Sequence, residues 1–171
     1  FTNLDVEVKA VEVINKDTAD DPMLAEQVAE ANFIYFSGGK PGYLHDTLKD
    51  SLTWSAVMQV LENGGIVAGC SAGAMIQGSK MMGGVSLSDG FGLLPNSVIL
   101  PHFDEYPGFI SRASRFISGS SIVTYGIDGM TALYHEDGQL EVIGSGGVTV
   151  LSQHGKQRFT AGPMPPLESF Q

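Results

Sequence analysis

A serine with a glycine two positions away on either side lies between an apolar segment and a helix-forming one. The apolar segment 66–70 is followed by Ser71, and Gly69 and Gly73 flank that serine. A serine at the tip of a tight strand-to-helix turn takes a strained backbone conformation and needs small residues at those two positions. Ser71 is therefore a candidate nucleophile for acyl transfer. The alternative is a glycine-rich turn that only packs or that binds an anion.

Cys70, the one cysteine, is the competing nucleophile at this turn. It would have Ala68 and Ala72 at the flanking positions, whereas the serine has glycines. The serine register fits the turn better, so we expect Cys70 to be a buried neighbour.

Backbone donors for an oxyanion could come from two places. The N–H of Ala72 follows the serine directly, and Gly38 and Gly39 follow the short apolar segment 32–36. Glycine lets the main chain approach a tetrahedral intermediate without a side chain in the way, so one of these two glycines could supply the second N–H. The alternative for the glycine pair is an ordinary turn after a buried strand.

His102 is a candidate general base. It directly follows Pro101 at the end of a predicted strand, 97–100. The carboxyl ends of parallel strands share one edge of a sheet, which would place His102 on the edge that carries Ser71. The alternative is a structural histidine with satisfied hydrogen bonds. We find no zinc-ligand spacing and no P-loop pattern, so the sequence predicts no metal and no cofactor.

Strand-like and helix-like segments alternate along the chain, separated by glycine and proline. Strands are predicted at 6–14, 32–36, 66–70, 97–100, 122–127, 131–135, 140–143 and 148–152. Helices are predicted at 21–31, from 43, at 52–62 and after His102. A loop or lid is expected between 79 and 90, and a surface strap at 163–166. The predicted class is α/β: a doubly wound, mainly parallel sheet flanked by helices, with antiparallel C-terminal hairpins.

Composition limits the class of protein further. With 171 residues, 43 % of them hydrophobic, the chain can form one α/β hydrolase-type domain over residues 1–171. A formal charge of −10 argues against nucleic acid or an anionic membrane as a partner. The apolar segments are too short to span a bilayer, and one cysteine cannot form an internal disulfide. We expect a soluble, cytoplasmic protein.

Six short motifs follow one another in a characteristic order. They are Phe36-Ser37-Gly38-Gly39, Gly69-Cys70-Ser71-Ala72-Gly73-Ala74, Gly90-Phe91-Gly92-Leu93-Leu94-Pro95, Pro101-His102-Phe103, Arg112-x-x-Arg115, and Gly126-Ile127-Asp128 with Thr131-Ala132-Leu133. In this order the chain resembles peptidase family S51, which contains the aspartyl dipeptidases called peptidase E and the cyanophycinases. The resemblance covers about 6–151 and implies a class I glutamine-amidotransferase-like sheet.

The resemblance implies a serine nucleophile, Ser71, and a general base, His102, that takes its proton and returns it to the leaving amine. It leaves the acid partner of the histidine open. Cyanophycinase-like sequences carry Glu directly after the Asp of the Gly-Ile-Asp motif, and here that position is Gly129. Asp128 and Asp89 are the remaining candidates; a water, or a dyad without an acid, are the alternatives.

The substrate implied is an Asp-X dipeptide or a short peptide with an N-terminal Asp. Arg112 matches the family's substrate-binding arginine, Arg115 follows it, and a guanidinium binds a carboxylate in bidentate fashion. The alternative is that both arginines are surface charges on an acidic protein. The resemblance begins partway into the family's pattern, which implies that the N-terminal strand and helix usually preceding Phe1 are missing; we then expect that a homodimer or another polypeptide could cover that sheet edge. A catalytically silent small-ligand module, and an esterase or amidase, are the alternative functions.

Overall fold

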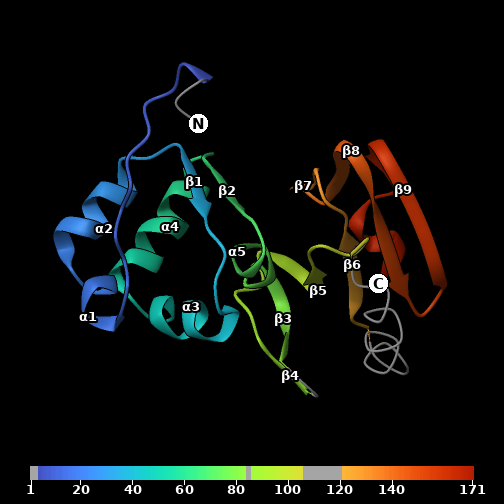
Figure 1. Ribbon diagram of the computed structural model, residues 1–171, viewed down its shortest axis with the longest axis horizontal. Helices are drawn as coiled ribbons and strands as arrows, with labels where there is room; N and C mark the ends of the chain where they lie inside the picture. The colour runs from blue at the N-terminus through green and yellow to red at the C-terminus, as the bar shows by residue number, and fades with distance from the viewer. Residues whose placement is uncertain (1–3, 84–85, 106–120) are drawn as a thin grey trace. The chain divides into compact units, whose positions relative to one another are not determined.

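The structure is a computed structural model that describes residues 4–83, 86–105 and 121–171. The chain divides into two compact units (Figure 1). Unit 1 consists of Phe1–Tyr35 and Tyr43–Ala68, and unit 2 of Phe36–Gly42 and Gly69–Gln171. The expectation of a single domain stays a prediction. In the described part, we find no helix with both the length and the apolar character needed to cross a membrane.

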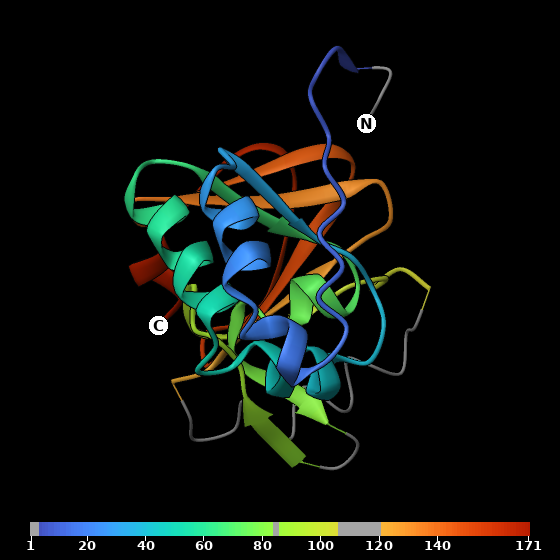
Figure 2. The same ribbon diagram turned by 90° about the vertical axis from the view of Figure 1, so that its left-hand side faces the viewer.

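Unit 1 is mainly helical. Its helices are α1 (Lys16–Ala19), α2 (Pro22–Ala29), α3 (Pro41–Leu48), whose first two residues belong to unit 2, and α4 (Leu52–Glu62). Capping explains where two of them begin. Asp21 accepts a hydrogen bond from the N–H of Met23 at the start of α2, and Ser51 caps α4 in the same way. Helices α2 and α4, blue and teal, pack side by side (Figure 2).

Two short strands precede the Gly38–Gly39 loop and the Ser71 turn, respectively. They are β1 (Phe33–Phe36) and β2 (Ile66–Gly69), which pair in a two-stranded sheet. Ile66 N donates to Asn32 O at 3.0 Å, and Cys70 N donates to Phe36 O at 3.1 Å. Donor and acceptor both advance by four residues, as expected for parallel strands. The predicted strands in these two places are confirmed.

The predicted strand at 6–14 is wrong, because this segment has no strand partner among the described residues. Val6 and Val8 are each 53 % exposed. Alternating apolar residues favour a strand, but the conformation needs a neighbouring backbone to take its hydrogen bonds.

Unit 2 contains a seven-stranded sheet in the order β4-β3-β5-β6-β8-β7, with β9 paired to β8. The pairs β3–β5 and β5–β6 are parallel, and the other pairs are antiparallel. Its strands are β3 (Gly78–Gly83), β4 (Ser86–Asp89), β5 (Leu94–Leu100), β6 (Val123–Ile127), β7 (Thr131–Glu136), β8 (Gln139–Ser152) and β9 (Gly155–Met164). The α/β class, with parallel central strands and antiparallel C-terminal hairpins, is confirmed.

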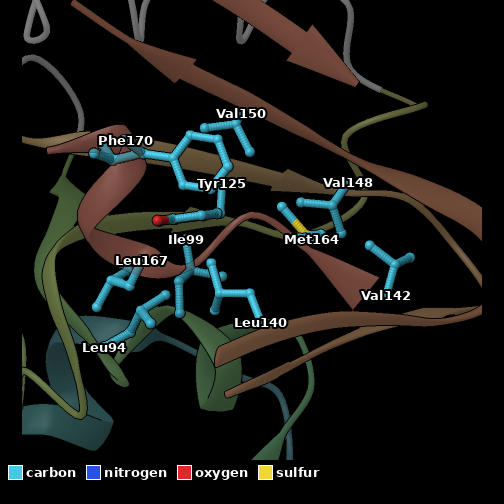
Figure 3. Packing of buried hydrophobic residues seen from close by; sticks show 11 residues of the cluster. Leu94, Ile99, Tyr125, Leu140, Val142, Val148, Val150, Met164, Leu167 and Phe170 are labelled. Carbon is cyan, nitrogen blue, oxygen red and sulfur yellow. The ribbon is translucent and has the colours of Figure 1, made fainter. Parts of the chain in front are cut away.

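Two sequence-based expectations in unit 2 are wrong. The segment expected to be a loop or lid at 79–90 forms the β3–β4 hairpin, with Met81 buried on β3. In the expected surface strap at 163–166, Pro163 and Pro165 are exposed, but Met164, which ends β9, is buried. Leu167 and Phe170 in the following 3-10 helix η2 (Leu167–Phe170) are buried as well. Figure 3 shows the side chains of Met164, Leu167 and Phe170 around Tyr125. The rings of Tyr125 and Phe170 meet edge-on, with their centroids 6.4 Å apart.

Candidate active site

The serine lies at a sharp turn between strand β2 and a short helix. Ser71 is the N-cap residue of α5 (Ala72–Met75), with φ 50° and ψ −117°. A positive φ with this ψ is sparsely populated for a residue with a side chain and costs about 1–3 kcal/mol. The predicted strand–serine–helix turn is confirmed. Cys70 beside it is exposed rather than buried, because it lies on the turn itself and not in the core.

The flanking glycines allow two backbone segments to touch. A Cβ on Gly69 would lie 2.4 Å from the carbonyl oxygen of Gly73. A Cβ on Gly73 would lie 2.3 Å from the carbonyl oxygen of Phe36, at the end of β1. Both distances are far below van der Waals contact, so any larger residue would push the turn away from β1 or from its own helix. These two glycines therefore hold Ser71 in its strained position.

The loop after β1 comes close to the serine side chain. A Cβ on Gly38 would lie 3.3 Å from Ser71 Cβ and 3.6 Å from Ser71 Oγ, and Gly39 has a φ of 140° that only glycine adopts freely. Within the described part of the chain, the backbone N–H groups of Gly38, Gly39 and Ala72 donate to no acceptor. Free N–H groups next to a serine hydroxyl can bind the oxygen of a tetrahedral intermediate.

His102 lies just beyond the carboxyl end of β5, in a turn held against the end of β6. Its neighbour Phe103 donates its N–H to the carbonyl oxygen of Ile127 at 3.0 Å. The His102 side chain is 49 % exposed, and its Nδ1 lies 3.9 Å from Glu105 Oε1. No hydrogen bond joins His102 to Ser71 among the residues described.

Asp128, the first of the two expected acids, follows β6 and is held by other groups. Its side chain is 4 % exposed, and Oδ2 accepts hydrogen bonds from Arg158 Nη2 at 2.5 Å and from the N–H of Gly147 at 3.0 Å. The hydrogen bond to Asp128 raises the pKa of Arg158 above its ordinary value. Oδ1 is buried and has no partner in the part of the chain that the structure describes.

Asp89, the second expected acid, lies on the β3–β4 hairpin. Its carboxylate is 70 % exposed and lies 2.5 Å from Lys80 Nζ, directly across the hairpin. Asp128 forms no hydrogen bond or ion pair with His102 among the described residues, and the partner of Asp89 in the hairpin is Lys80 rather than His102.

Three residues near the histidine turn were not singled out from the sequence. Asp104 Oδ1 accepts the N–H of Gly129 at 2.9 Å, and its Oδ2 lies 3.5 Å from where a Cβ on Gly129 would be. Glu105, which follows His102 by three residues, faces its imidazole. The signal available was the run of two acids directly after His102-Phe103. Arg158 had no such signal, because β9 was not predicted.

Arg112 and Arg115, the expected substrate-binding residues, lie outside the described residues. Across 4–83, 86–105 and 121–171, no group of three or more His, Cys, Asp or Glu side chains could hold a metal ion.

Comparison with curated proteins relates the chain to cyanophycinases. A cyanophycinase of Synechococcus elongatus is 32 % identical over 168 residues, which cover 86 % of this chain and 51 % of the relative. A cyanophycinase of Geminocystis herdmanii is 26 % identical over 170 residues, which cover 88 % and 62 %. The chain thus spans about half the length of the first of these relatives.

Two solved structures share the fold. A peptidase from an acI-B1 Actinobacterium is similar with a TM-score of 0.82 and 33 % identity, over 94 % of this chain and 69 % of that one. A putative peptidase E protein from Listeria monocytogenes EGD-e has a TM-score of 0.56 and 18 % identity, over 70 % and 63 %, which supports the fold alone. The sequence pattern named Peptidase family S51 matches residues 1–143, and the chain therefore belongs to peptidase family S51.

Proposed function

We propose that the protein is a serine-type peptidase that hydrolyses short peptides through an acyl-enzyme on Ser71. The observation that carries the proposal is the backbone of Ser71, φ 50° and ψ −117°, next to Gly38. A strained residue is retained where the surrounding structure enforces it, and such residues concentrate at active sites. Here the close contacts of Gly69 and Gly73 enforce the strain. In the described part of the chain, the N–H groups of Gly38, Gly39 and Ala72 donate to no acceptor.

The proposed reaction uses groups of this chain alone. Ser71 Oγ attacks the peptide carbonyl while His102 takes the hydroxyl proton, and the carbonyl oxygen becomes an oxyanion. The N–H of Ala72 and that of Gly38 or Gly39 donate to this oxygen, and the loss of one such donor costs about 3 kcal/mol of transition-state stabilisation. His102 then gives the proton to the leaving amine. Water attacks the acyl-enzyme with His102 again as base, and Ser71 is released.

The substrate we propose is an Asp-X dipeptide or a short peptide with an N-terminal Asp. The support is chemical: Arg112 and Arg115 follow His102 by ten and thirteen residues, and the chain has only nine lysines and arginines in total. In a protein of net charge −10, an acidic substrate needs a local cation, and a guanidinium matches a carboxylate with two parallel hydrogen bonds.

The experiment that tests the chemistry is covalent labelling with a fluorophosphonate, followed by intact-mass measurement. We expect one adduct on the unsubstituted protein, none on Ser71→Ala, and a much slower reaction of His102→Ala. Glu62→Gln is a matched surface control, because Glu62 is exposed on α4 and its side chain forms no hydrogen bond or ion pair among the described residues. Absence of an adduct on folded protein would reject the nucleophile and favour the silent binding module.

A substrate panel tests the finer proposal. Asp-Leu, Ala-Leu and Asn-Leu dipeptides, and the p-nitrophenyl ester of a short acid, separate a peptidase selective for Asp from a general esterase or amidase. We expect hydrolysis of Asp-Leu and a loss of kcat/KM for that peptide in Arg112→Ala, with the fluorophosphonate rate retained. Equal turnover of Asp-Leu and Asn-Leu would reject the carboxylate preference while leaving the serine chemistry intact.

A further inference from the structure

Among the described residues, one carboxylate faces the imidazole of His102, and it is neither of the two expected from the sequence. Glu105 Oε1 lies 3.9 Å from His102 Nδ1. We propose that Glu105 is the positioning residue for His102, in place of Asp128 or Asp89. The inference rests on the proposed function, because it assigns the group that orients the base of that reaction.

The backbone of the turn supports the pairing. Glu105 donates its N–H to the carbonyl oxygen of His102 at 3.1 Å, so that residues 102–105 form a hydrogen-bonded turn. Such a turn brings its first and fourth residues together. The backbone of Glu105 therefore stays near that of His102, which leaves the imidazole within reach of the glutamate side chain.

Two contacts fix this turn to the end of β6. Phe103 N donates to Ile127 O at 3.0 Å, and Asp104 Oδ1 accepts the N–H of Gly129 at 2.9 Å. Asp104 is thereby occupied by the backbone of residue 129. Of the two acids that follow Phe103, Glu105 is the one whose carboxylate faces the imidazole.

Asp128 is less suited to the role because its interactions are already made. To reach His102, Oδ2 would have to leave both the guanidinium of Arg158 and the N–H of Gly147. Arg158 also neutralises its charge, so the field that it could exert on an imidazole is reduced. Asp128 instead holds the segment on which the histidine turn docks.

The proposed role is to select a tautomer. A carboxylate that accepts a hydrogen bond from Nδ1–H leaves the lone pair on Nε2, which then takes the proton of Ser71, and it stabilises the imidazolium that results. The 3.9 Å between His102 Nδ1 and Glu105 Oε1 is longer than a hydrogen bond. Both side chains are about half exposed or more, at 49 % and 60 %, so a rotamer change can close the gap when substrate binds.

The test measures kcat and KM separately, on the peptide that the substrate panel identifies, for Glu105→Gln, Glu105→Asp, Asp128→Asn, Asp89→Asn and the surface control Glu62→Gln. For Glu105→Gln we expect kcat to fall roughly 10- to 100-fold, less than the ~10⁴ of a buried triad acid, because solvent screens this pair. KM should stay within about twofold, since Glu105 acts through the histidine and not on the substrate. Glu105→Asp should recover part of the lost kcat, a rescue that a structural role would not give.

The midpoint of thermal unfolding is measured on the same variants, to separate catalysis from folding. We expect Glu105→Gln to have the same midpoint of thermal unfolding as the unsubstituted protein, because the Glu105 carboxylate is exposed. Unchanged kcat in Glu105→Gln, or a loss of kcat in Asp128→Asn or Asp89→Asn at unchanged stability, would overturn the inference. Failure of the proposed function is a different result, because the unsubstituted protein would then neither label with fluorophosphonate nor turn over peptide.

Discussion

Replacing Ser71 with glycine should stabilise the protein relative to replacing it with alanine. Both substitutions remove the hydroxyl, so they differ only in the Cβ. At φ 50° and ψ −117° the Cβ costs about 1–3 kcal/mol, which glycine does not incur. Glycine loses about 0.4–1 kcal/mol through the greater freedom of its unfolded chain. The net expectation is that Ser71→Gly is about 1 kcal/mol more stable than Ser71→Ala.

Ser55, in the middle of α4, supplies the matched control. It is exposed and helical, and its Oγ donates to Ser51 O at 3.0 Å, a bond that both substitutions remove equally. In a helix, glycine is less stable than alanine by about 1 kcal/mol. The order of the two variants at Ser55 should therefore be the reverse of the order at Ser71.

The assay is thermal and urea unfolding of the four variants, followed by circular dichroism. For a chain of this length 1 kcal/mol corresponds to about 2–4 °C in the unfolding midpoint, so both differences are measurable. If Ser71→Gly is less stable than Ser71→Ala by as much as the Ser55 pair differ, the serine carries no backbone strain in solution. Ser71 would then not be held in a strained conformation by its surroundings.

Three further predictions concern groups around the site and in the core. Gly73→Ala places a Cβ 2.3 Å from a backbone oxygen and should cost about 1–3 kcal/mol and abolish fluorophosphonate labelling, whereas Gly42→Ala, with nothing within 4 Å, should be tolerated. Urea unfolding of the two variants decides this, and equal stability would contradict it. Arg158→Met leaves the buried carboxylate of Asp128 without its cation and should cost about 2 kcal/mol, below the value for a fully buried pair because the arginine is half exposed. The double variant with Asp128→Asn should regain most of that loss, and strictly additive costs in a double-mutant cycle would refute the coupling. Tyr125→Phe removes a hydroxyl that is buried without a hydrogen-bond partner in the described part, so stability at pH 7 should be unchanged or higher by about 1 kcal/mol. Burial raises the pKa of Tyr125, so above about pH 10 the phenol ionises in the unfolded chain while it stays neutral in the folded protein, and the stability of the unsubstituted protein falls as the pH rises. Urea unfolding between pH 8 and 11 should therefore show a steeper decline for the unsubstituted protein than for Tyr125→Phe, and parallel declines would contradict the assignment.

The sequence by itself determined the elements whose causes are local. The capping residue Asp21 and the following proline predict α2, and the glycines on either side of Ser71 predict the turn, because both depend on steric and hydrogen-bonding demands within a few residues. The same short-range logic placed His102 at the end of a strand. Local patterns failed at 6–14, where alternating apolar residues predict a strand but no neighbouring strand pairs with the segment among the described residues.

Only the tertiary structure decided which groups these residues meet. Strand β9 is mostly exposed, and it is a strand because β8 supplies its hydrogen bonds. That pairing brings Arg158 to Asp128, thirty positions away in the chain. Asp128, a candidate partner of the histidine from the sequence, therefore binds the guanidinium instead. A carboxylate has the same local sequence signal whether it binds an arginine, a lysine or an imidazole. Its partner is set by contacts between distant segments, which no local pattern encodes.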